Sequence, residues 1–175
     1  MRSSSRATRA RRSRSATDYS QTRSRQSTAP LSSSTVGRSA VITAGDATAS
    51  KAIQGESKAF LTVAGQPMVV GLVLTLQSVP EVSDVWVVGN RSRLREVFDQ
   101  PDVQAAIHKP LHLVEQGRNL LENAWETYRK TLAQDPEKGR DPVGEEIDVP
   151  IFFLSTDLPF ATPQELSAFA RESAT

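Results

Sequence analysis

Ile151-Phe152-Phe153-Leu154-Ser155-Thr156-Asp157-Leu158-Pro159-Phe160 is the stretch that decides the fold. Its first four residues are all apolar, as in a parallel strand that is buried on both faces. The run ends in a carboxylate, Asp157, and ligands of open α/β sheets bind where such strands end. A carboxylate at that edge is suited to hold a divalent metal against a phosphate-bearing substrate. Asp is also common in turns, so a plain turn at Asp157 is the alternative interpretation.

Other segments alternate between strand-like and helix-like patterns. We expect strands at residues 40–44, 85–88, 111–114 and 151–154, and helices at residues 68–77, 92–99 and 119–132. A further helix should begin after Thr162, with Pro163 in its first turn and Glu165 completing a capping box. This alternation predicts an α/β, Rossmann-like three-layer sandwich with a mainly parallel sheet. With only three or four strands before Thr175, we expect the sheet to be incomplete at its C-terminus.

Charge divides the 175-residue chain into two unlike parts. Residues 1–38 hold nine Arg and one acid, Asp18, a net charge of +8. The remaining residues hold 12 bases and 19 acids, a net charge of −7. A polar segment with one sign of charge cannot bury enough surface to offset the entropy of ordering. We therefore expect residues 1–38 to be a disordered tail and residues 39–175 to be the folded domain, with residues 45–57 and 134–148 as loops.

Three interpretations of the tail remain open. Its Arg clusters could neutralise the phosphates of a nucleic acid. Its richness in Arg and Ser, with few acids, is also typical of an organelle transit peptide. The third interpretation is a solvated leader or a start codon placed too early. No apolar stretch follows the basic residues, so a secretory signal peptide is not expected.

The composition excludes several kinds of site. The sequence contains no Cys, which excludes disulfides, thiolate metal sites and a Cys nucleophile, and it fits a reducing compartment such as the cytoplasm. No run of 18 apolar residues occurs, so a membrane span is not expected. His108 and His112 are four residues apart, but Pro110 breaks the helix that would align them, and we expect both at the surface. Trp125 and Tyr128 are expected to cover the sheet.

Gly45-Asp46-Ala47-Thr48-Ala49-Ser50-Lys51-Ala52 follows the first expected strand and can be compared with two phosphate-binding patterns. A P-loop has a second Gly before the Lys and a Ser or Thr after it, where this chain has Ser50 and Ala52. A dinucleotide-binding fingerprint has three Gly at fixed spacing, and only Gly45 is present. Both matches fail.

A third pattern uses more of the chain. The first expected strand leads into Gly45, a loop continues to Lys58, and Leu61, Gly65, Pro67 and Met68 follow at fixed spacing. Residues 85–89 give a second strand, Glu115-Gln116-Gly117 comes with Asn119 and Asn123, and residues 154–160 carry Asp157. In this order, from about residue 40 to 170, the chain resembles the N-terminal portion of the MobA-like NTP transferase (nucleotidyltransferase) superfamily.

The resemblance implies a reaction and a set of roles. The reaction is the Mg²⁺-dependent transfer of an NMP group from an NTP to a phosphorylated small-molecule acceptor, such as a molybdopterin-type cofactor or a sugar phosphate, with release of pyrophosphate. Lys58 and Asp157 would be catalytic, and Asp157 would hold the metal. The nucleotide would be bound by Ala44, Gly45, Lys51, Lys58, Gln116, Gly117 and Asn119.

One residue departs from the family pattern. Asp46 stands where a second Gly is usual, and an acid there would repel a triphosphate unless it faces away or helps to hold the metal. A non-catalytic nucleotide-binding or regulatory module derived from the same fold is therefore the alternative. Binding to nucleic acid is expected only through the Arg-rich tail.

Overall fold

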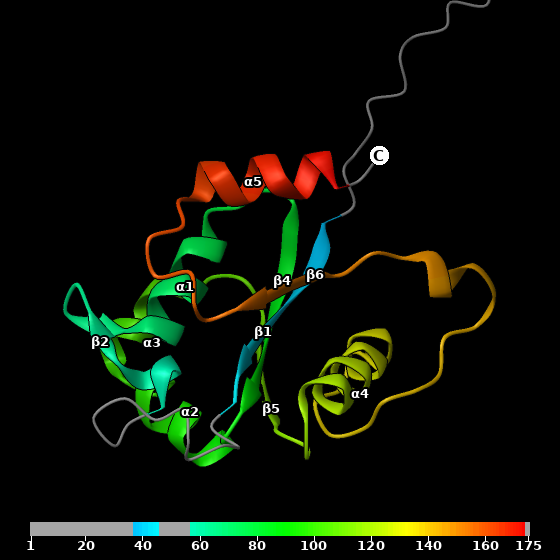
Figure 1. Ribbon diagram of the computed structural model, residues 1–175, viewed down its shortest axis with the longest axis horizontal. Helices are drawn as coiled ribbons and strands as arrows, with labels where there is room; N and C mark the ends of the chain where they lie inside the picture. Colours follow the sequence, from blue (N-terminus) through cyan, green and yellow to red (C-terminus); the bar gives the residue numbers. More distant parts are fainter. Residues whose placement is uncertain (1–36, 46–56, 174–175) are drawn as a thin grey trace, which may run out of the picture. The chain divides into compact units, whose positions relative to one another are not determined.

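Four parallel strands form the sheet, in the order β5-β4-β1-β6. The computed structural model describes residues 37–45 and 57–173 of the chain. The strands are β1 (Arg38–Ala44), β4 (Val82–Gly89), β5 (Leu111–Glu115) and β6 (Phe152–Ser155). Figure 1 shows β1 and β4 crossing the middle of the sheet. The four strands predicted from the sequence are therefore present, with small differences in their ends.

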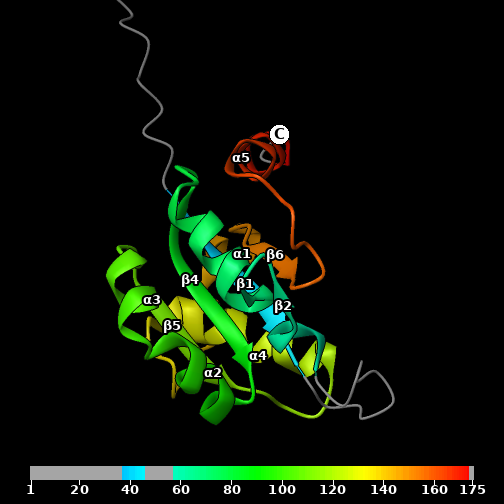
Figure 2. The same cartoon turned by 90° about the vertical axis from the view of Figure 1, so that its left-hand side faces the viewer.

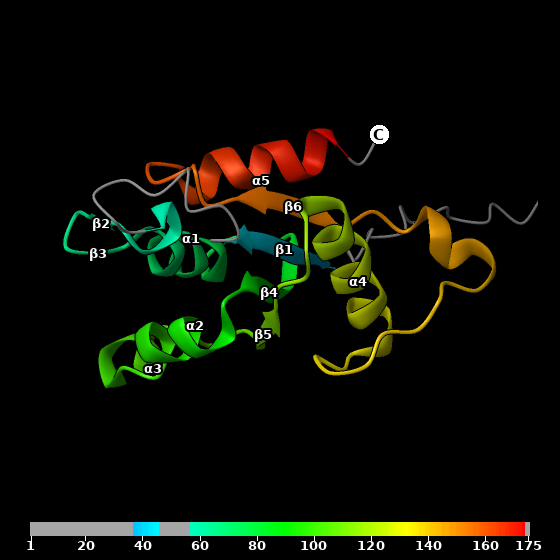
Figure 3. The same ribbon diagram turned by 60° about the horizontal axis from the view of Figure 1, so that its bottom comes forward.

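Helices lie on both faces of the sheet (Figure 3). One face packs against α1 (Met68–Gln77), α2 (Arg91–Phe98), α3 (Pro101–Ala106) and α5 (Pro163–Glu172). On the other face α4 (Leu120–Ala133) contacts β1 and β4. Figures 2 and 3 show α2 and α3 toward the β5 side of the sheet and α5 toward the β6 side. The predicted α/β sandwich with a parallel sheet is confirmed.

The larger core lies between the sheet and the helices of the first face. Val69, Val73 and Leu76 of α1 are fully buried in it, against Ile42 of β1 and Val87 of β4. Their three- and four-residue spacing puts them on one side of α1, as the sequence pattern predicted. Burial of a Val or Leu side chain contributes about 1.5–3 kcal/mol, so this layer supplies much of the stability of the fold.

The opposite face of the sheet has a smaller core, which contains Val41, Trp86, Val88 and Val114. The side of α4 that is turned inward is polar, with Asn123, Thr127 and Thr131 buried. These residues are four apart and define one side of the helix. Trp125 lies on another side and is 46 % exposed, so the prediction that it covers the sheet is wrong.

Tyr128 is partly buried, and its hydroxyl donates a hydrogen bond to the carbonyl oxygen of Glu146 over a distance of 2.8 Å. Glu146 belongs to the short 3₁₀ helix η3 (Gly144–Asp148), which lies within the predicted surface loop at residues 134–148. Tyr128 therefore fastens this loop to α4.

Several short elements are absent from the sequence-based prediction. They are η2 (Lys58–Phe60), the hairpin of β2 (Thr62–Val63) and β3 (Gln66–Pro67), and helix α3. The hairpin turns at Ala64 and Gly65, whose φ angles of 51° and 88° lie in the left-handed region that Gly favours. Elements of two to six residues are too short to show a hydrophobic period, which explains why they were missed.

Strand β4 begins three residues earlier than the sequence pattern predicted, because Asp84 interrupts its apolar run. The Asp84 carboxylate is buried and accepts hydrogen bonds from the hydroxyls of Ser39 and Ser83 and from the indole N–H of Trp86. Buried polar groups are tolerated when they are hydrogen-bonded, so an acid can occupy this strand.

The sequence predicted that both histidines lie at the surface. This is confirmed for His108, which is exposed, and wrong for His112. The His112 ring is partly buried and stacks on Trp86, with ring centroids 4.0 Å apart and planes 18° apart. Burial lowers the pKa of the His112 imidazole, against a smaller opposing effect of Asp84. The residue belongs to β5, where Trp86 of the neighbouring strand lies directly beside it.

The predicted capping box at the start of α5 is confirmed, because Thr162 and Glu165 each accept a hydrogen bond from the backbone N–H of the other. The predicted tail at residues 1–38, apart from its last two residues, and most of the predicted loop at 45–57 lie outside the described residues. None of the helices in the described part of the chain has the length and apolar character needed to cross a lipid bilayer.

Candidate functional site

The order of the strands identifies one place at the carboxyl edge of the sheet, next to β1, where a ligand is expected. From β1 the chain proceeds to β4 and β5 on one side, and it then returns to β6 on the other side of β1. The strand order thus reverses at β1, and the connections after β1 and β6 leave the sheet at neighbouring positions. Ligands of open α/β sheets bind at such a switch point.

Lys58 and Asp157 meet at this position. The Lys58 Nζ lies 3.8 Å from the Asp157 Oδ1, and the two side chains are 47 % and 58 % exposed. Lys58 comes from the connection after β1, and Asp157 from the connection after β6. Exposed ion pairs contribute about 0–1 kcal/mol to stability. The pair therefore adds little to the fold, and both side chains are accessible to a ligand.

Lys58 is held by the single turn of η2. The backbone N–H of Phe60 donates to the carbonyl of Ser57 over 3.0 Å, and that of Leu61 donates to the carbonyl of Lys58 over 3.1 Å. Ala59 and Phe60 are buried in the main core. The turn is thus anchored by two apolar side chains and directs the first residue, Lys58, toward solvent.

Asp157 starts a turn and also lies at the sheet edge, so the two interpretations of this residue are compatible. Its backbone N–H donates to the Ser155 hydroxyl over 3.3 Å, while the preceding Thr156 is buried. Farther on, the N–H of Ala161 donates to the carbonyl of Leu158. The Asp157 carboxylate is exposed and pairs with Lys58.

Two glycines allow close approach of the chain at the same edge. A Cβ atom on Gly89 would lie 2.7 Å from the Ala44 carbonyl oxygen, a distance that real Cβ atoms do not adopt. A Cβ atom on Gly45 would lie 3.3 Å from the Gln116 Oε1, which places the Gln116 side chain beside the end of β1. Ala44, Gly45 and Gln116, three of the predicted nucleotide-binding residues, therefore lie close together. Asp46 and Lys51 lie outside the described residues.

The loop between β5 and α4 contains the other predicted nucleotide-binding residues. The Gly117 N–H donates to the Asn123 Oδ1 over 2.5 Å, and the Glu122 N–H donates to the Asn119 Oδ1 over 2.9 Å. Asn119 is the N-cap of α4. Its side-chain oxygen is thus engaged by the helix, and its amide N–H groups are the part that could meet a ligand.

Arg118, in the same loop, pairs with Glu122 at 3.2 Å, and this hydrogen bond lowers the pKa of the Glu122 carboxyl. A shallow cavity of about 420 Å³ adjoins the loop. It is lined by Arg118, Asn119, Leu121, Glu122 and Trp125.

The fit of a metal ion at Asp157 can be judged from the donors around it. Among residues 37–45 and 57–173, no group of three or more His, Asp or Glu side chains could together hold a metal ion. Mg²⁺ usually keeps several waters and binds through one or two carboxylates together with substrate phosphates. A lone accessible carboxylate such as Asp157 fits a metal that arrives with a nucleotide, and it does not fit a dedicated protein cage.

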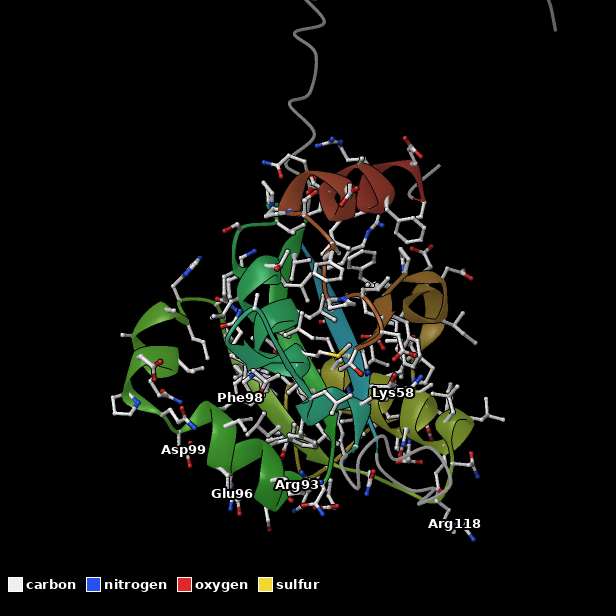
Figure 4. All side chains as sticks on the ribbon, turned by 60° about the vertical axis from the view of Figure 1, so that its left-hand side comes forward. Lys58, Arg93, Glu96, Phe98, Asp99 and Arg118 are labelled. Atoms are coloured by element: carbon white, nitrogen blue, oxygen red, sulfur yellow. The ribbon has the colours of Figure 1, made fainter. Side chains whose placement is uncertain are left out.

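Arg93 is a residue of this edge that the sequence interpretation missed. It lies in the first turn of α2, directly after β4, and its guanidinium carbon is 4.2 Å from the centre of the Phe60 ring. Figure 4 shows Lys58, Arg93 and Arg118 toward the end of the molecule away from α5. The signal for Arg93 in the sequence was its position directly after a strand of the parallel sheet. The connections that follow parallel strands all start at the same edge of the sheet.

The solved structures that are similar to this chain include a synthase and a synthetase. The 4-diphosphocytidyl-2C-methyl-D-erythritol synthase from Anaerococcus prevotii matches with a TM-score of 0.54 and 13% identity, over 79% of this chain and 52% of that chain. A CMP:2-keto-3-deoxy-manno-octonic acid synthetase complexed with CTP matches with a TM-score of 0.39 and 18% identity, over 79% of this chain and 48% of that chain.

The chain thus spans about half the length of the solved structures that it matches. No curated protein matches it in sequence. The sequence profile of the MobA-like NTP transferase domain matches residues 40–175, which is most of the chain. The protein belongs to the MobA-like NTP transferase family, and residues 40–175 form a nucleotidyltransferase-like domain.

Proposed function

We propose that the domain transfers an NMP group from a Mg²⁺-bound NTP to a phosphorylated small-molecule acceptor and releases pyrophosphate. The observation that carries this proposal is the Lys58–Asp157 pair at the switch point of the sheet. A cation and a carboxylate that lie side by side, and that contribute little to stability, suit a ligand that brings both phosphates and a metal ion.

The reaction can be written so that its atoms balance. A phosphate oxygen of the acceptor attacks the α-phosphorus of the NTP, the bond from that phosphorus to the bridging oxygen breaks, and pyrophosphate leaves with the bond electrons. Such a displacement needs alignment of the reactants and stabilisation of the developing negative charge more than it needs a protein nucleophile. A Lys and backbone N–H groups can supply this stabilisation.

Each residue of the site takes one part of this task. Lys58 neutralises charge on the phosphates, and Gly45 lets the backbone approach them closely. Asp157 would hold Mg²⁺, which when bound neutralises phosphate charge. Gln116, beside the end of β1, and Gly117, in the loop between β5 and α4, line the nucleoside side of the site.

The remaining assignments are extensions of this proposal. We assign Ala44 and Lys51 to the phosphates and the amide N–H groups of Asn119 to the nucleoside. The acceptor is a phosphorylated small molecule, such as a molybdopterin-type cofactor or a sugar phosphate.

A non-catalytic nucleotide-binding or regulatory module is the second candidate. Within the described residues, Asp157 belongs to no group of three or more His, Asp or Glu side chains that could hold a metal ion. Asp46, at a position where the family usually has Gly, favours the same candidate. A module of this kind would bind a nucleotide and would not release pyrophosphate.

Two measurements test the proposal. Calorimetric titration with ATP, GTP, CTP and UTP, with and without Mg²⁺, should give binding that depends on the metal. A pyrophosphate-release assay with a panel of sugar phosphates and pterin phosphates then separates the two candidates. Binding without pyrophosphate release from any acceptor favours the regulatory module, whereas absence of binding for all four nucleotides contradicts both.

A further inference from the structure

The guanidinium of Arg93 lies over the ring of Phe60, at 4.2 Å from its centre. Phe60 is the last residue of η2, and Lys58 is the first. The contact therefore joins the connection that carries Lys58 to the connection that follows β4. The side chains of Lys58 and Arg93 are labelled in Figure 4.

The turn that carries Lys58 cannot hold its own conformation. η2 has three residues, and its two internal hydrogen bonds run from Phe60 N–H to the Ser57 carbonyl and from Leu61 N–H to the Lys58 carbonyl. Isolated turns of this length are unstable in water because nucleation of a helix is unfavourable. The position of Lys58 therefore depends on how firmly the neighbouring Ala59 and Phe60 are held.

Arg93 is well placed to hold Phe60, because its own backbone is fixed at two points. The Arg93 N–H donates to the Asn90 Oδ1 over 3.2 Å, which caps α2. The next residue, Leu94, is fully buried in the main core. The Arg93 side chain thus extends from a rigid helix start onto the outer side of the Phe60 ring.

We propose that Arg93 is a positioning residue for Lys58, because its guanidinium clamps the Phe60 ring and so fixes the turn that presents Lys58 to the nucleotide phosphates. This inference rests on the proposed function of Lys58. A planar guanidinium stacks on an aromatic face better than an ammonium does, so Lys is a poor replacement at this position.

A double-mutant cycle tests whether Arg93 acts on nucleotide binding through Lys58. Arg93→Ala should weaken the binding of the Mg-nucleotide by about three- to tenfold, the range of a partly desolvated cation–π contact. The same substitution in a Lys58→Ala background should have no further effect, because the residue that it positions is gone. Arg95→Ala, which removes an exposed Arg from the same helix, is the matched control and should bind normally.

Two outcomes of the cycle overturn the proposal. A loss that persists in the Lys58→Ala background means that Arg93 contacts the nucleotide itself. A lowered melting temperature with unchanged affinity means that the Arg93–Phe60 contact only stabilises the fold. Arg93→Lys separates charge from stacking, and it should bind as weakly as Arg93→Ala.

Amide hydrogen exchange tests the clamp without any nucleotide. The Leu61 amide, whose acceptor is the Lys58 carbonyl, should exchange about three- to tenfold faster in Arg93→Ala than in wild type or Arg95→Ala. Unchanged exchange overturns the inference, whatever the nucleotide measurements show. Faster exchange in a protein that binds no nucleotide supports the clamp on the turn and contradicts the proposed function of Lys58.

Discussion

At the scale of single residues, the pairing of Lys58 with Asp157 is compatible with the proposal that one site receives both a metal and a phosphate. Each side chain is about half exposed, and their separation of 3.8 Å is longer than that of a direct charge-assisted hydrogen bond. A phosphate can replace Asp157 as the partner of Lys58, and a metal ion can replace Lys58 as the partner of Asp157. The exchange of partners costs little, because an exposed ion pair is weak.

Lys58→Ala should weaken nucleotide binding and leave the fold unchanged. A charge-assisted hydrogen bond to a phosphate contributes about 1.5–3 kcal/mol, so affinity should fall by roughly ten- to more than hundredfold. The measurement is calorimetric titration of the Mg-nucleotide that binds wild type best. Lys138→Ala, which removes an exposed Lys from the loop after α4, is the control. Equal affinity in wild type and Lys58→Ala would show that Lys58 is only a surface residue.

Asp157→Asn should abolish the dependence of nucleotide binding on Mg²⁺. The amide keeps the shape of the side chain and removes the negative charge that Mg²⁺ needs. Titrations of both proteins with and without Mg²⁺ measure the effect, and the melting temperature should stay unchanged because the lost ion pair is exposed. If Asp157→Asn binds the Mg-nucleotide as well as wild type does, the carboxylate is only part of a turn.

The sequence predicted some of these residues and missed others for physical reasons. Asp157 could be found because it ends an apolar strand, and Lys58 because it lies in a segment that resembles a known family. The position of Arg93 after a parallel strand could be read from the sequence, but its contact with Phe60 could not, since only the order of the strands brings these two connections together. The capping role of Asn119 also depends on where α4 begins.

At the scale of elements, α5 is fastened to the loop before β4 by a buried carboxylate. Glu81 accepts a hydrogen bond from the Ser167 hydroxyl over 2.7 Å and pairs with Arg171 at 3.0 Å. Arg38 adds a hydrogen bond from its guanidinium to the Ala170 carbonyl. The hydrogen bond from Ser167 is the largest cause of the lowered pKa of Glu81, and burial opposes it.

The lowered pKa gives the stability of the protein a specific dependence on pH. Glu81 has a lower pKa in the folded protein than its usual 4.5, so it contributes its full stability above that value. This contribution is lost as the pH falls from about 4.5 through the folded pKa. The free energy of unfolding of Glu81→Gln should therefore be about 1–2 kcal/mol lower than that of wild type at pH 7. Below pH 4.5 it should also depend less on pH than that of wild type.

Urea unfolding at several pH values between 3 and 7 measures this difference. Glu96→Gln, in which the changed side chain is an exposed carboxylate on α2, is the control and should keep the pH dependence of wild type. Parallel curves for wild type and Glu81→Gln below pH 4.5 would show that another group causes the acid sensitivity.

Long periodic elements were predicted well, and short or polar ones were not. The bounds of α1 were predicted correctly because its apolar residues repeat at helical spacing over ten residues. β4 was predicted too short because its buried Asp84 looks like the end of a strand unless its three hydrogen-bond donors are known. The placement of α4 was predicted, but its inward side was not, because Asn123, Thr127 and Thr131 are not apolar.

At the scale of the whole molecule, the apolar core of residues 37–45 and 57–173 can be set beside the composition of the Arg-rich segment. The buried core residues run from Ala40 of β1 to Ala170 of α5. Residues 1–36 contain eight Arg and many Ser but few large apolar side chains. The sequence therefore predicts that these residues contribute almost no buried surface, and that the free energy of folding comes from the rest of the chain.

A chain shortened to residues 37–175 should consequently fold as stably as the full chain and bind the same nucleotide with the same affinity. The two melting temperatures, measured by circular dichroism, should agree within about 2 °C, which corresponds to less than 1 kcal/mol for a domain of this size. If the Arg-rich segment instead packs on the domain or reaches the phosphates of the nucleotide, the short chain should melt earlier or bind more weakly. A test with single-stranded and duplex nucleic acid at two salt concentrations completes the comparison. Binding that is lost with residues 1–36 and weakens steeply with salt would identify the segment as a nucleic-acid-binding arm, because each phosphate contact releases counterions.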